Sequence, residues 1–188
     1  QVPLSKILGT GLFDLERASA APGWARELEG EHAPETEAYG IGSFVLRSTE
    51  PLHPWRFSSF MDHPFAGLIR AKGYVWVASQ PEWVVSYSRA GNVATHEPVG
   101  RWWAAASRER WPAPGTPQRE AIDSRWQEPW GDRLNEVVFI GRGMDRAGIE
   151  QAWQAVHLTA DEIRQGMRAW TKLPDPFPTW AAAPESVA

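Results

Sequence analysis

Residues 68–79 read Leu-Ile-Arg-Ala-Lys-Gly-Tyr-Val-Trp-Val-Ala-Ser, and this stretch decides the fold. Its centre, residues 74–77, consists of aromatic and β-branched residues, which favour strands, with apolar groups on both sides of the pleat. Trp83, Val85 and Tyr87 then alternate with more polar residues, and Gly91 indicates a turn. We expect adjacent strands at 72–79 and 83–87. Because the stretch holds no nucleophile, metal cluster or phosphate loop, it is typical of an interaction module.

Three other regions have the alternation or the composition of strands. Residues 39–46 alternate on two faces, and further short strands are expected from Val93 and at 101–105. Residues 136–140 are apolar on both faces, which is typical of a strand in the centre of a sheet. The sheet is therefore expected to contain four to five strands.

Helices are expected where a capping residue or a proline precedes an apolar stripe. Pro54 and Pro117 suit first helical positions, and Asp145 can cap a helix with apolar residues at every third or fourth position. Thr159 and Glu162 have the spacing of a capping box, which begins a last helix expected to reach residue 170. The chain thus reads as an α+β protein, with a mixed, mainly antiparallel sheet and helices packed on one face. The first strand–helix–strand unit implies a parallel crossover, and a ferredoxin-like arrangement is one option.

Composition divides the chain into three segments. Residues 1–38 are expected to form a helical lead-in or linker, and their seven acidic and three basic side chains give a net charge of −4. Because the whole chain also carries −4, the other residues are neutral overall. Residues 39–172 are expected to form the α+β domain, and the prolines at 174, 176 and 178 predict a mobile tail over residues 173–188.

The composition argues against several classes of function. The chain has 188 residues and no cysteine, which removes disulfides, thiolate zinc sites and cysteine nucleophiles. The balanced charge of residues 39–188 offers no basic patch for nucleic acid, and no apolar run approaches the ~18 residues of a membrane span. We find no signal peptide and expect a cytoplasmic protein. Because residue 1 is Gln and not Met, we also expect a part of a longer chain.

The 12 tryptophans are the unusual feature of the composition, and they have two interpretations. Trp fills protein cores, and together with Arg it also provides much of the binding energy at protein interfaces. We select Lys72, Arg101, Trp102 and Trp103 as a candidate partner surface, because basic and aromatic residues on strands suit protein contacts. The alternative is that one Trp of the pair lies in the core and the other caps the sheet edge.

No catalytic or cofactor-binding residue is expected in this chain. The five histidines include no pair spaced by three or four residues, the helical spacing that brings two metal ligands together. The best metal candidates are Glu31, His32 and Glu35, since carboxylate and imidazole groups can share a divalent ion. A solvated acidic loop explains the same residues without a metal.

Seven blocks, in order, resemble the C-terminal part of the CobW family of P-loop GTPases. They are Val2-Pro-Leu-Ser-Lys-Ile-Leu-Gly, Glu35-Thr-Glu-Ala-Tyr-Gly-Ile-Gly, Pro51-Leu-His-Pro-Trp-Arg-Phe, Arg70-Ala-Lys-Gly-Tyr-Val-Trp-Val, Gly100-Arg-Trp-Trp-Ala, Trp130-Gly-Asp-Arg-Leu-Asn-Glu and Leu158-Thr-Ala-Asp-Glu. The resemblance covers residues 2–162. It implies that residues 1–38 leave a GTPase domain that this chain lacks, and that the second domain of the family follows.

The resemblance also implies a function for the longer protein. Family members are similar to metallochaperones, zinc-handling proteins and cobalamin-biosynthesis factors, and they bind GTP through a Gly-x-x-x-x-Gly-Lys-Ser/Thr loop. Neither this loop nor the family's Cys-x-Cys-Cys motif occurs in the sequence. GTP, Mg²⁺ and zinc or cobalt are therefore expected only with the missing GTPase domain. Many members carry a His-rich stretch before the second domain, whereas residues 30–37 contain only His32.

The sequence leaves three functions open. The first is a non-catalytic, partner-binding and regulatory domain of a GTP-dependent metallochaperone, active in metal delivery, zinc or cobalt homeostasis, or cobalamin biosynthesis. Its partners would be the GTPase domain of the same parent chain and a client metalloprotein, without nucleic acid or membrane. The second is an autonomous metal-binding module, suggested by the acidic loop. The third is a structural dimerisation domain, suggested by the tryptophans, so that a homo-oligomer is possible.

Overall fold

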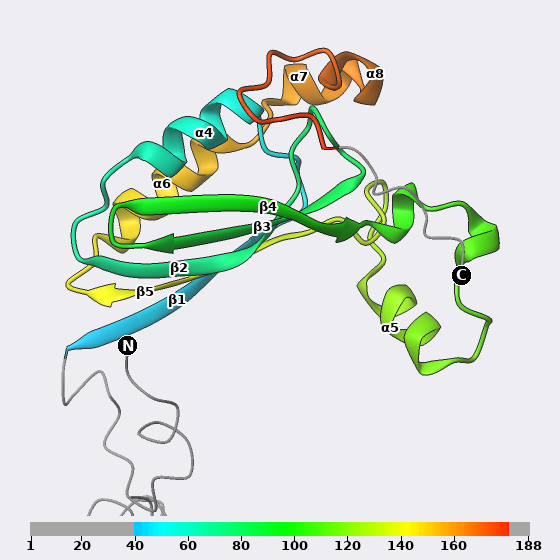
Figure 1. The fold of residues 1–188 in the computed structure, drawn as a ribbon, viewed down its shortest axis with the longest axis horizontal. Helices are drawn as coiled ribbons and strands as arrows, with labels where there is room; N and C mark the ends of the chain where they lie inside the picture. Colours follow the sequence, from blue (N-terminus) through cyan, green and yellow to red (C-terminus); the bar gives the residue numbers. More distant parts are fainter. Residues whose placement is uncertain (1–39, 181–188) are drawn as a thin grey trace, which may run out of the picture. The chain divides into compact units, whose positions relative to one another are not determined.

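The computed structural model describes residues 40–180, which form a sheet with helices on one face (Figure 1). In chain order the elements are β1 (Ile41–Ser48), α4 (Pro54–Asp62), β2 (Leu68–Val75), β3 (Trp83–Ala90), β4 (Val93–Arg101), α5 (Pro117–Arg125), β5 (Asn135–Arg142), α6 (Arg146–Val156), α7 (Ala160–Gln165) and α8 (Met167–Trp170). Two single-turn 3-10 helices, Trp103–Ala105 and Arg108–Arg110, lie between β4 and α5. The predicted α+β architecture is confirmed. The predicted linker at residues 1–38 lies outside the described residues.

The five strands are ordered β1-β5-β2-β3-β4, and neighbouring strands run antiparallel throughout. β1 and β2 are both antiparallel to β5, so they run in the same direction with β5 between them. With α4 as the connection, they form a split β-α-β unit, which ferredoxin-like folds also contain. The central position predicted for residues 136–140 is confirmed, because these residues belong to β5.

Two glycines determine how closely the strands can turn and approach. Gly91 has a φ of 57° in the turn that joins β3 to β4, a conformation that favours glycine. Gly73 faces β5 so closely that a Cβ would overlap the backbone carbonyl of Glu136. The β3–β4 hairpin and the close pairing of β2 with β5 therefore each depend on a residue without a side chain.

Helices α4 and α6 lie side by side on one face of the sheet (Figure 1). The apolar stripes predicted for both helices are confirmed, because α4 buries Phe57, Phe60 and Met61, and α6 buries a stripe centred on Trp153. The rings of Phe60 and Trp153 are 5.5 Å apart and join the two helices. Phe139 of β5 is fully buried beneath them. No helix within residues 40–180 is long and apolar enough to cross a membrane.

A second, smaller core joins the C-terminal helices to the ends of the strands. Trp76, Trp102 and Trp170 are its buried aromatic residues, with Ala78 and Leu158. The single last helix predicted over residues 160–170 is wrong, because the chain breaks at Gly166, whose φ is 78°. The break lets α8 turn so that Trp170 donates its indole N–H to the backbone carbonyl of Glu162 at 2.6 Å.

Two predicted strands differ from the observed ones. β2 ends at Val75, earlier than predicted, because the backbone of Trp76 and Ala78 instead bonds to Leu52. The strand predicted at 101–105 is wrong. The carboxylate of Asp132 accepts hydrogen bonds from the backbone of Trp103 and Ala104, both at 2.9 Å, and a 3-10 helix forms there.

Residues 173–180, predicted as the start of a mobile tail, are packed against the sheet. Phe177 is only 8% exposed and contacts Phe57 of α4, with ring centres 5.8 Å apart. Asp175 accepts hydrogen bonds from the side chains of Ser79 and Gln80. α8 ends at Trp170, before the three prolines, and Phe177, which lies between the last two of them, returns the chain to the core. The rest of the predicted tail, residues 181–188, lies outside the described residues.

Candidate partner-binding surface

Half of the side chains of the sheet point away from α4 and α6, because residues along a strand alternate between its two faces. The strand register aligns them in three rows, which we call the open face: Ser43–Ile140–Arg70–Ala90–Val93, Val45–Val138–Lys72–Ser88–Thr95 and Arg47–Glu136–Tyr74–Ser86–Glu97. Each row crosses the whole sheet from β1 to β4. The open face is therefore a continuous surface built by all five strands.

Apolar side chains are accessible in the open face. Tyr74 is 53% exposed, Ile140 36% and Val93 68%. The residues next to them on the other face, such as Ala71 and Phe139, are fully buried. Exposed aromatic and aliphatic groups that are mixed with polar ones are also the composition of protein interfaces.

The four residues selected from the sequence do not lie together. Lys72 is exposed in the middle row of the open face, on the central part of β2. Arg101, at the end of β4, places its guanidinium carbon 4.8 Å from the centre of the Trp83 ring. Trp102 is 8% exposed and donates its indole N–H to the backbone carbonyl of Trp83 at 2.7 Å, so it belongs to the core. Trp103 is half-buried in the 3-10 helix that follows.

The insertion between β4 and β5 borders one end of the open face. Its rings form a stack in which Trp111 lies 6.3 Å from Trp103 and 5.2 Å from Trp126, and the guanidinium of Arg108 lies 3.8 Å from the Trp111 ring centre. A groove of about 500 Å³ separates this insertion from the sheet. Its walls include Tyr74, Val84, Trp103, Arg125, Leu134 and Glu136. The open face thus continues into a concave rim.

Sequence reasoning missed most of the open face, although a signal was present. Arg70, Lys72 and Tyr74 are spaced by two residues, and the intervening Ala71 and Gly73 are small. In a strand this spacing places the three long side chains on one face. The sequence interpretation stressed residues 74–77 as apolar on both faces, and this concealed the division at residues 70–74.

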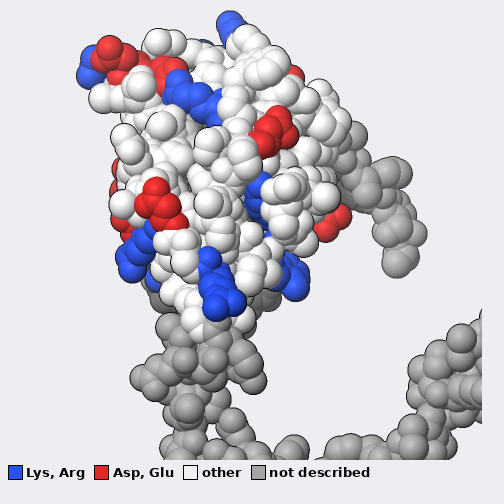
Figure 2. All heavy atoms as spheres, turned by 90° about the vertical axis from the view of Figure 1, so that its left-hand side faces the viewer, with Lys and Arg blue, Asp and Glu red and all other residues white. Residues whose placement is uncertain are grey.

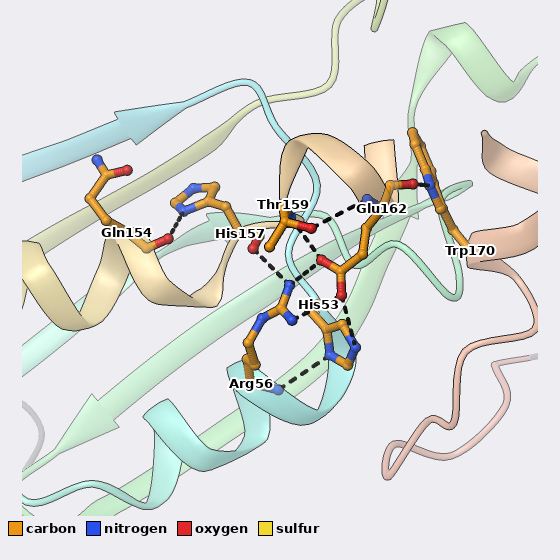
Figure 3. A network of polar contacts seen from close by, with 7 residues as sticks. All are labelled: His53, Arg56, Gln154, His157, Thr159, Glu162 and Trp170. Carbon is orange, nitrogen blue, oxygen red and sulfur yellow. Dashed lines mark hydrogen bonds and ion pairs between the residues drawn. The ribbon is translucent and has the colours of Figure 1, made fainter. Parts of the chain in front are cut away.

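A polar network on the opposite side of the sheet fastens the helices to one another (Figure 3). The guanidinium of Arg56 in α4 donates two hydrogen bonds to the carboxylate of Glu162 in α7, at 2.6 and 3.0 Å. It donates a third to the backbone carbonyl of His157 at 2.8 Å. The capping box predicted for Thr159 and Glu162 is confirmed, since both of its hydrogen bonds are present. Glu162 therefore caps α7 and anchors α4 with the same carboxylate.

Burial and ion pairing determine the protonation states of the titratable side chains in this network. Hydrogen bonds from Arg56 lower the pKa of Glu162 to about 2, so its carboxylate is ionised at neutral pH. Burial lowers the pKa of His53 and of His157, which favours their neutral forms. The ring of His157 is hydrogen-bonded to the hydroxyl of Ser48 at 2.6 Å, which holds β1 to the end of α6. These contacts stabilise the helical layer, although the Nε atom of Arg56 is buried without a hydrogen-bond partner among the described residues.

The candidate metal ligands Glu31, His32 and Glu35 lie outside the described residues. Within residues 40–180, no three His, Cys, Asp or Glu side chains are grouped so that they could hold a metal ion. The polar network of Arg56, His157 and Glu162 holds α4, α6 and α7 together.

Comparison with known proteins places the domain in a family. The model of the cobalamin synthesis protein CobW C-terminal domain matches residues 41–157, which run from β1 to the end of α6. The chain is 38% identical over 180 residues to zinc-regulated GTPase metalloprotein activator 1 of Dictyostelium discoideum, which covers 94% of the chain and 38% of that protein. It is 30% identical over 130 residues to a zinc chaperone of Mycobacterium tuberculosis, covering 69% of the chain and 32% of that protein.

The chain thus spans about a third of the length of these two curated relatives. Among solved structures, it is similar to the Zn(II)-bound YjiA GTPase from E. coli, with a TM-score of 0.43 and 15% identity, over 68% of the chain and 33% of that protein. The family match includes all five strands of the sheet and hence the whole open face. The chain belongs to the family of the CobW C-terminal domain.

Proposed function

We propose that this chain is the non-catalytic, partner-binding and regulatory domain of a GTP-dependent metallochaperone. The open face of the sheet is the observation that carries the proposal. A five-stranded sheet covered by helices on one face leaves apolar groups such as Tyr74 and Ile140 accessible on the other. A protein partner that covers this face would remove these groups from water, which is the main favourable contribution to most protein associations.

The relatives support a role in metal homeostasis. One is named a zinc-regulated GTPase metalloprotein activator and another a zinc chaperone. Because the chain spans about a third of each, we assign GTP, Mg²⁺ and the transported metal to a GTPase domain elsewhere in the parent protein. That domain and a client metalloprotein are the proposed partners, and the cytoplasm is the proposed location.

Regulation requires that the domain distinguish the nucleotide states of the GTPase. A ligand shifts an equilibrium only if it binds the two states with different free energies. The domain would therefore bind the GTP-bound form and the GDP-bound form with different affinities, by a factor of about 5 to 150 for typical coupling energies. Nucleotide hydrolysis would then change which surfaces are free for the client.

Isothermal titration calorimetry tests this function directly. The 188-residue chain is titrated into the separately expressed GTPase domain of its parent protein, loaded with GTP or a non-hydrolysable analogue, and then with GDP. We expect measurable binding in at least one state and at least a five-fold difference between them. Equal affinity in both states contradicts the regulatory role, and absence of binding in both contradicts contact with the GTPase domain.

A further inference from the structure

Among residues 40–180, three basic side chains of the sheet lack partners on the side that the helices leave uncovered. Arg70 and Lys72 lie on β2, and Arg142 ends β5, opposite Ile41. All three are exposed. None of their side chains has a hydrogen bond, ion pair or ring contact in the described part of the chain. They differ in this from Arg47, whose guanidinium pairs with Glu136 at 2.5 Å in the same face.

Apolar residues surround these cations. In the register, Lys72 lies between Val138 and Ser88, and Arg70 lies between Ile140 and Ala90. The carboxylate of Glu136 is engaged by Arg47, and Glu97 lies on the edge strand β4. The centre of the open face is therefore locally basic and partly apolar, in a chain whose net charge is −4.

We infer that the centre of the open face binds an acidic amphipathic helix of a protein partner. This inference rests on the proposed function, because it names the kind of partner and the place where it binds. Arg70 and Lys72 are two residues apart on one strand, which separates them by about 6.6 Å. Carboxylates four residues apart on a helix are separated by about 6 Å along its axis, so a pair of them matches the two cations.

The apolar groups give the helix a second set of contacts. Aliphatic side chains next to the acidic ones on the partner helix would pack on Val138 and Ile140, which flank the two cations. A helix that lies on a sheet uses its apolar face in this way, and the ion pairs fix its position and direction. Arg142 lies at the end of the neighbouring strand β5, opposite Ile41, and would accommodate a third carboxylate.

Charge distribution favours a protein over a nucleic acid as the partner. At the end of the domain where β1 begins, basic and acidic side chains are dispersed among uncharged ones (Figure 2). Nucleic-acid surfaces carry a stripe of many cations along a groove, which suits the continuous charge of a phosphate backbone. Three cations flanked by Val138 and Ile140 suit a ligand that carries both carboxylates and aliphatic groups.

A designed peptide is a probe for this surface. Its helix carries Glu and Leu on one face with Glu residues four apart, and a control peptide has Lys in place of every Glu. Each is titrated into the ¹⁵N-labelled 188-residue chain, and binding is followed by amide chemical shifts and by fluorescence anisotropy. We expect the acidic peptide to shift amides of β2 and β5, and the affinity to decrease as salt concentration rises.

Matched variants locate the site. R70E/K72E is expected to weaken binding of the acidic peptide at least ten-fold, because attraction becomes repulsion. R168E/K172E changes the net charge by the same amount at exposed positions of the α8 region and is expected to leave binding unchanged. The amide spectrum reports whether each variant is folded, and Lys72→Gln, which adds no charge of opposite sign, provides a milder second test.

Several results would overturn the inference. These are no binding up to about millimolar peptide, equal binding of the basic peptide, an equal loss in R168E/K172E, or tighter binding of a single-stranded oligonucleotide. If the GTPase domain binds but R70E/K72E leaves its affinity and that of the acidic peptide unchanged, this location is wrong while the proposed function stands. If the acidic peptide binds at β2 and β5 but the GTPase domain does not, the surface stands and the proposed GTPase partner is wrong.

Discussion

The two faces of the sheet are built by the same five strands and have opposite chemistry. On the covered face, Phe139 and Tyr87 are fully buried against α4 and α6. On the open face, the neighbouring Ile140 is 36% exposed, and Lys72 is exposed without a partner in the described residues. Core packing and solvent exposure therefore fall to alternate residues of the same strands, and under the proposed function the exposed residues are the ones that bind a partner.

The difference also implies that substitutions on the two faces have unequal effects on stability. A buried face tolerates few substitutions, because each lost methylene leaves a cavity among packed neighbours. An exposed face contributes little to folding, so its composition is free to follow the partner. A substitution on the open face that unfolds the domain, or one on the covered face that leaves its stability unchanged, would contradict this difference between the faces.

The largest expected effect comes from adjacent residues of β5 that point to opposite faces. Phe139→Ala should lower the free energy of unfolding by about 3–5 kcal/mol, because it removes a fully buried ring that stacks on Phe44. Ile140→Ala should cost no more than about 1 kcal/mol, because its side chain is partly exposed. Urea denaturation of the two variants measures the difference. Similar costs for both would show that the open face is covered in the folded chain.

The next effect concerns the link between α4 and α7. Glu162→Gln should lower the free energy of unfolding by about 1.5–3 kcal/mol, because it weakens the bidentate pair with Arg56. Glutamine can still complete the capping box. Asp161→Asn is the matched control, since Asp161 pairs with Arg164 on the exposed surface, and it should cost less than about 1 kcal/mol. Thermal or urea denaturation measures both variants. If Asp161→Asn lost as much stability as Glu162→Gln, the ion pair of Glu162 with Arg56 would not be the link between α4 and α7.

Acidification should weaken the covered face in two steps. His53 and His157 have lowered pKa values in the folded domain, so the unfolded chain binds more protons as pH falls below about 6.5, and stability decreases. Each contributes at most about 1.4 kcal/mol per pH unit. Glu162, with its pKa lowered to about 2, retains its full contribution above about pH 4.5 and loses it as pH falls from there toward 2.

A neutral replacement of His157 separates the first step from the second. His157→Asn removes the titration of the buried ring and should flatten the decrease in stability between about pH 7 and about pH 5.5. It should leave the decrease below about pH 4.5 unchanged, because that part belongs to carboxylates such as Glu162. Denaturant midpoints across this range provide the measurement. An unchanged slope in the upper range would mean that His157 is not held neutral by burial.

Local sequence features predicted the elements of the fold well. Helices begin as expected at Pro117 and after the capping residues Asp145 and Thr159, because these signals depend only on residues within one turn. One failure occurred where a distant residue decides, because the carboxylate of Asp132 turns residues 103–105 into a 3-10 helix. The other was local, since Gly166 permits a break that the apolar periodicity of residues 163–170 conceals.

The candidate site was less accessible to sequence reasoning. Trp102 and Trp103 look equivalent in the sequence, but Trp102 is buried because its indole reaches the backbone of Trp83. The open face requires the strand order, which places β5 between β1 and β2 and could not be read from local pattern. Arg56 and Glu162 are separated by 106 residues, so nothing near either of them indicates their pairing.

The smallest expected effect on stability is the most informative about function. Lys72→Thr should leave the isolated domain as stable as before, or up to about 0.5 kcal/mol more stable, because threonine favours strands and no side-chain partner of Lys72 is lost. The same change should weaken binding of the acidic helix. Ser88→Thr, its neighbour in the same row, changes strand propensity without changing charge and should leave binding unaffected.

A residue whose removal stabilises the fold while it weakens binding is retained for the partner. If Lys72→Thr instead destabilises the domain by more than about 1 kcal/mol, Lys72 stabilises the sheet itself. The open face would then contribute to folding, and the contrast between the two faces would not hold.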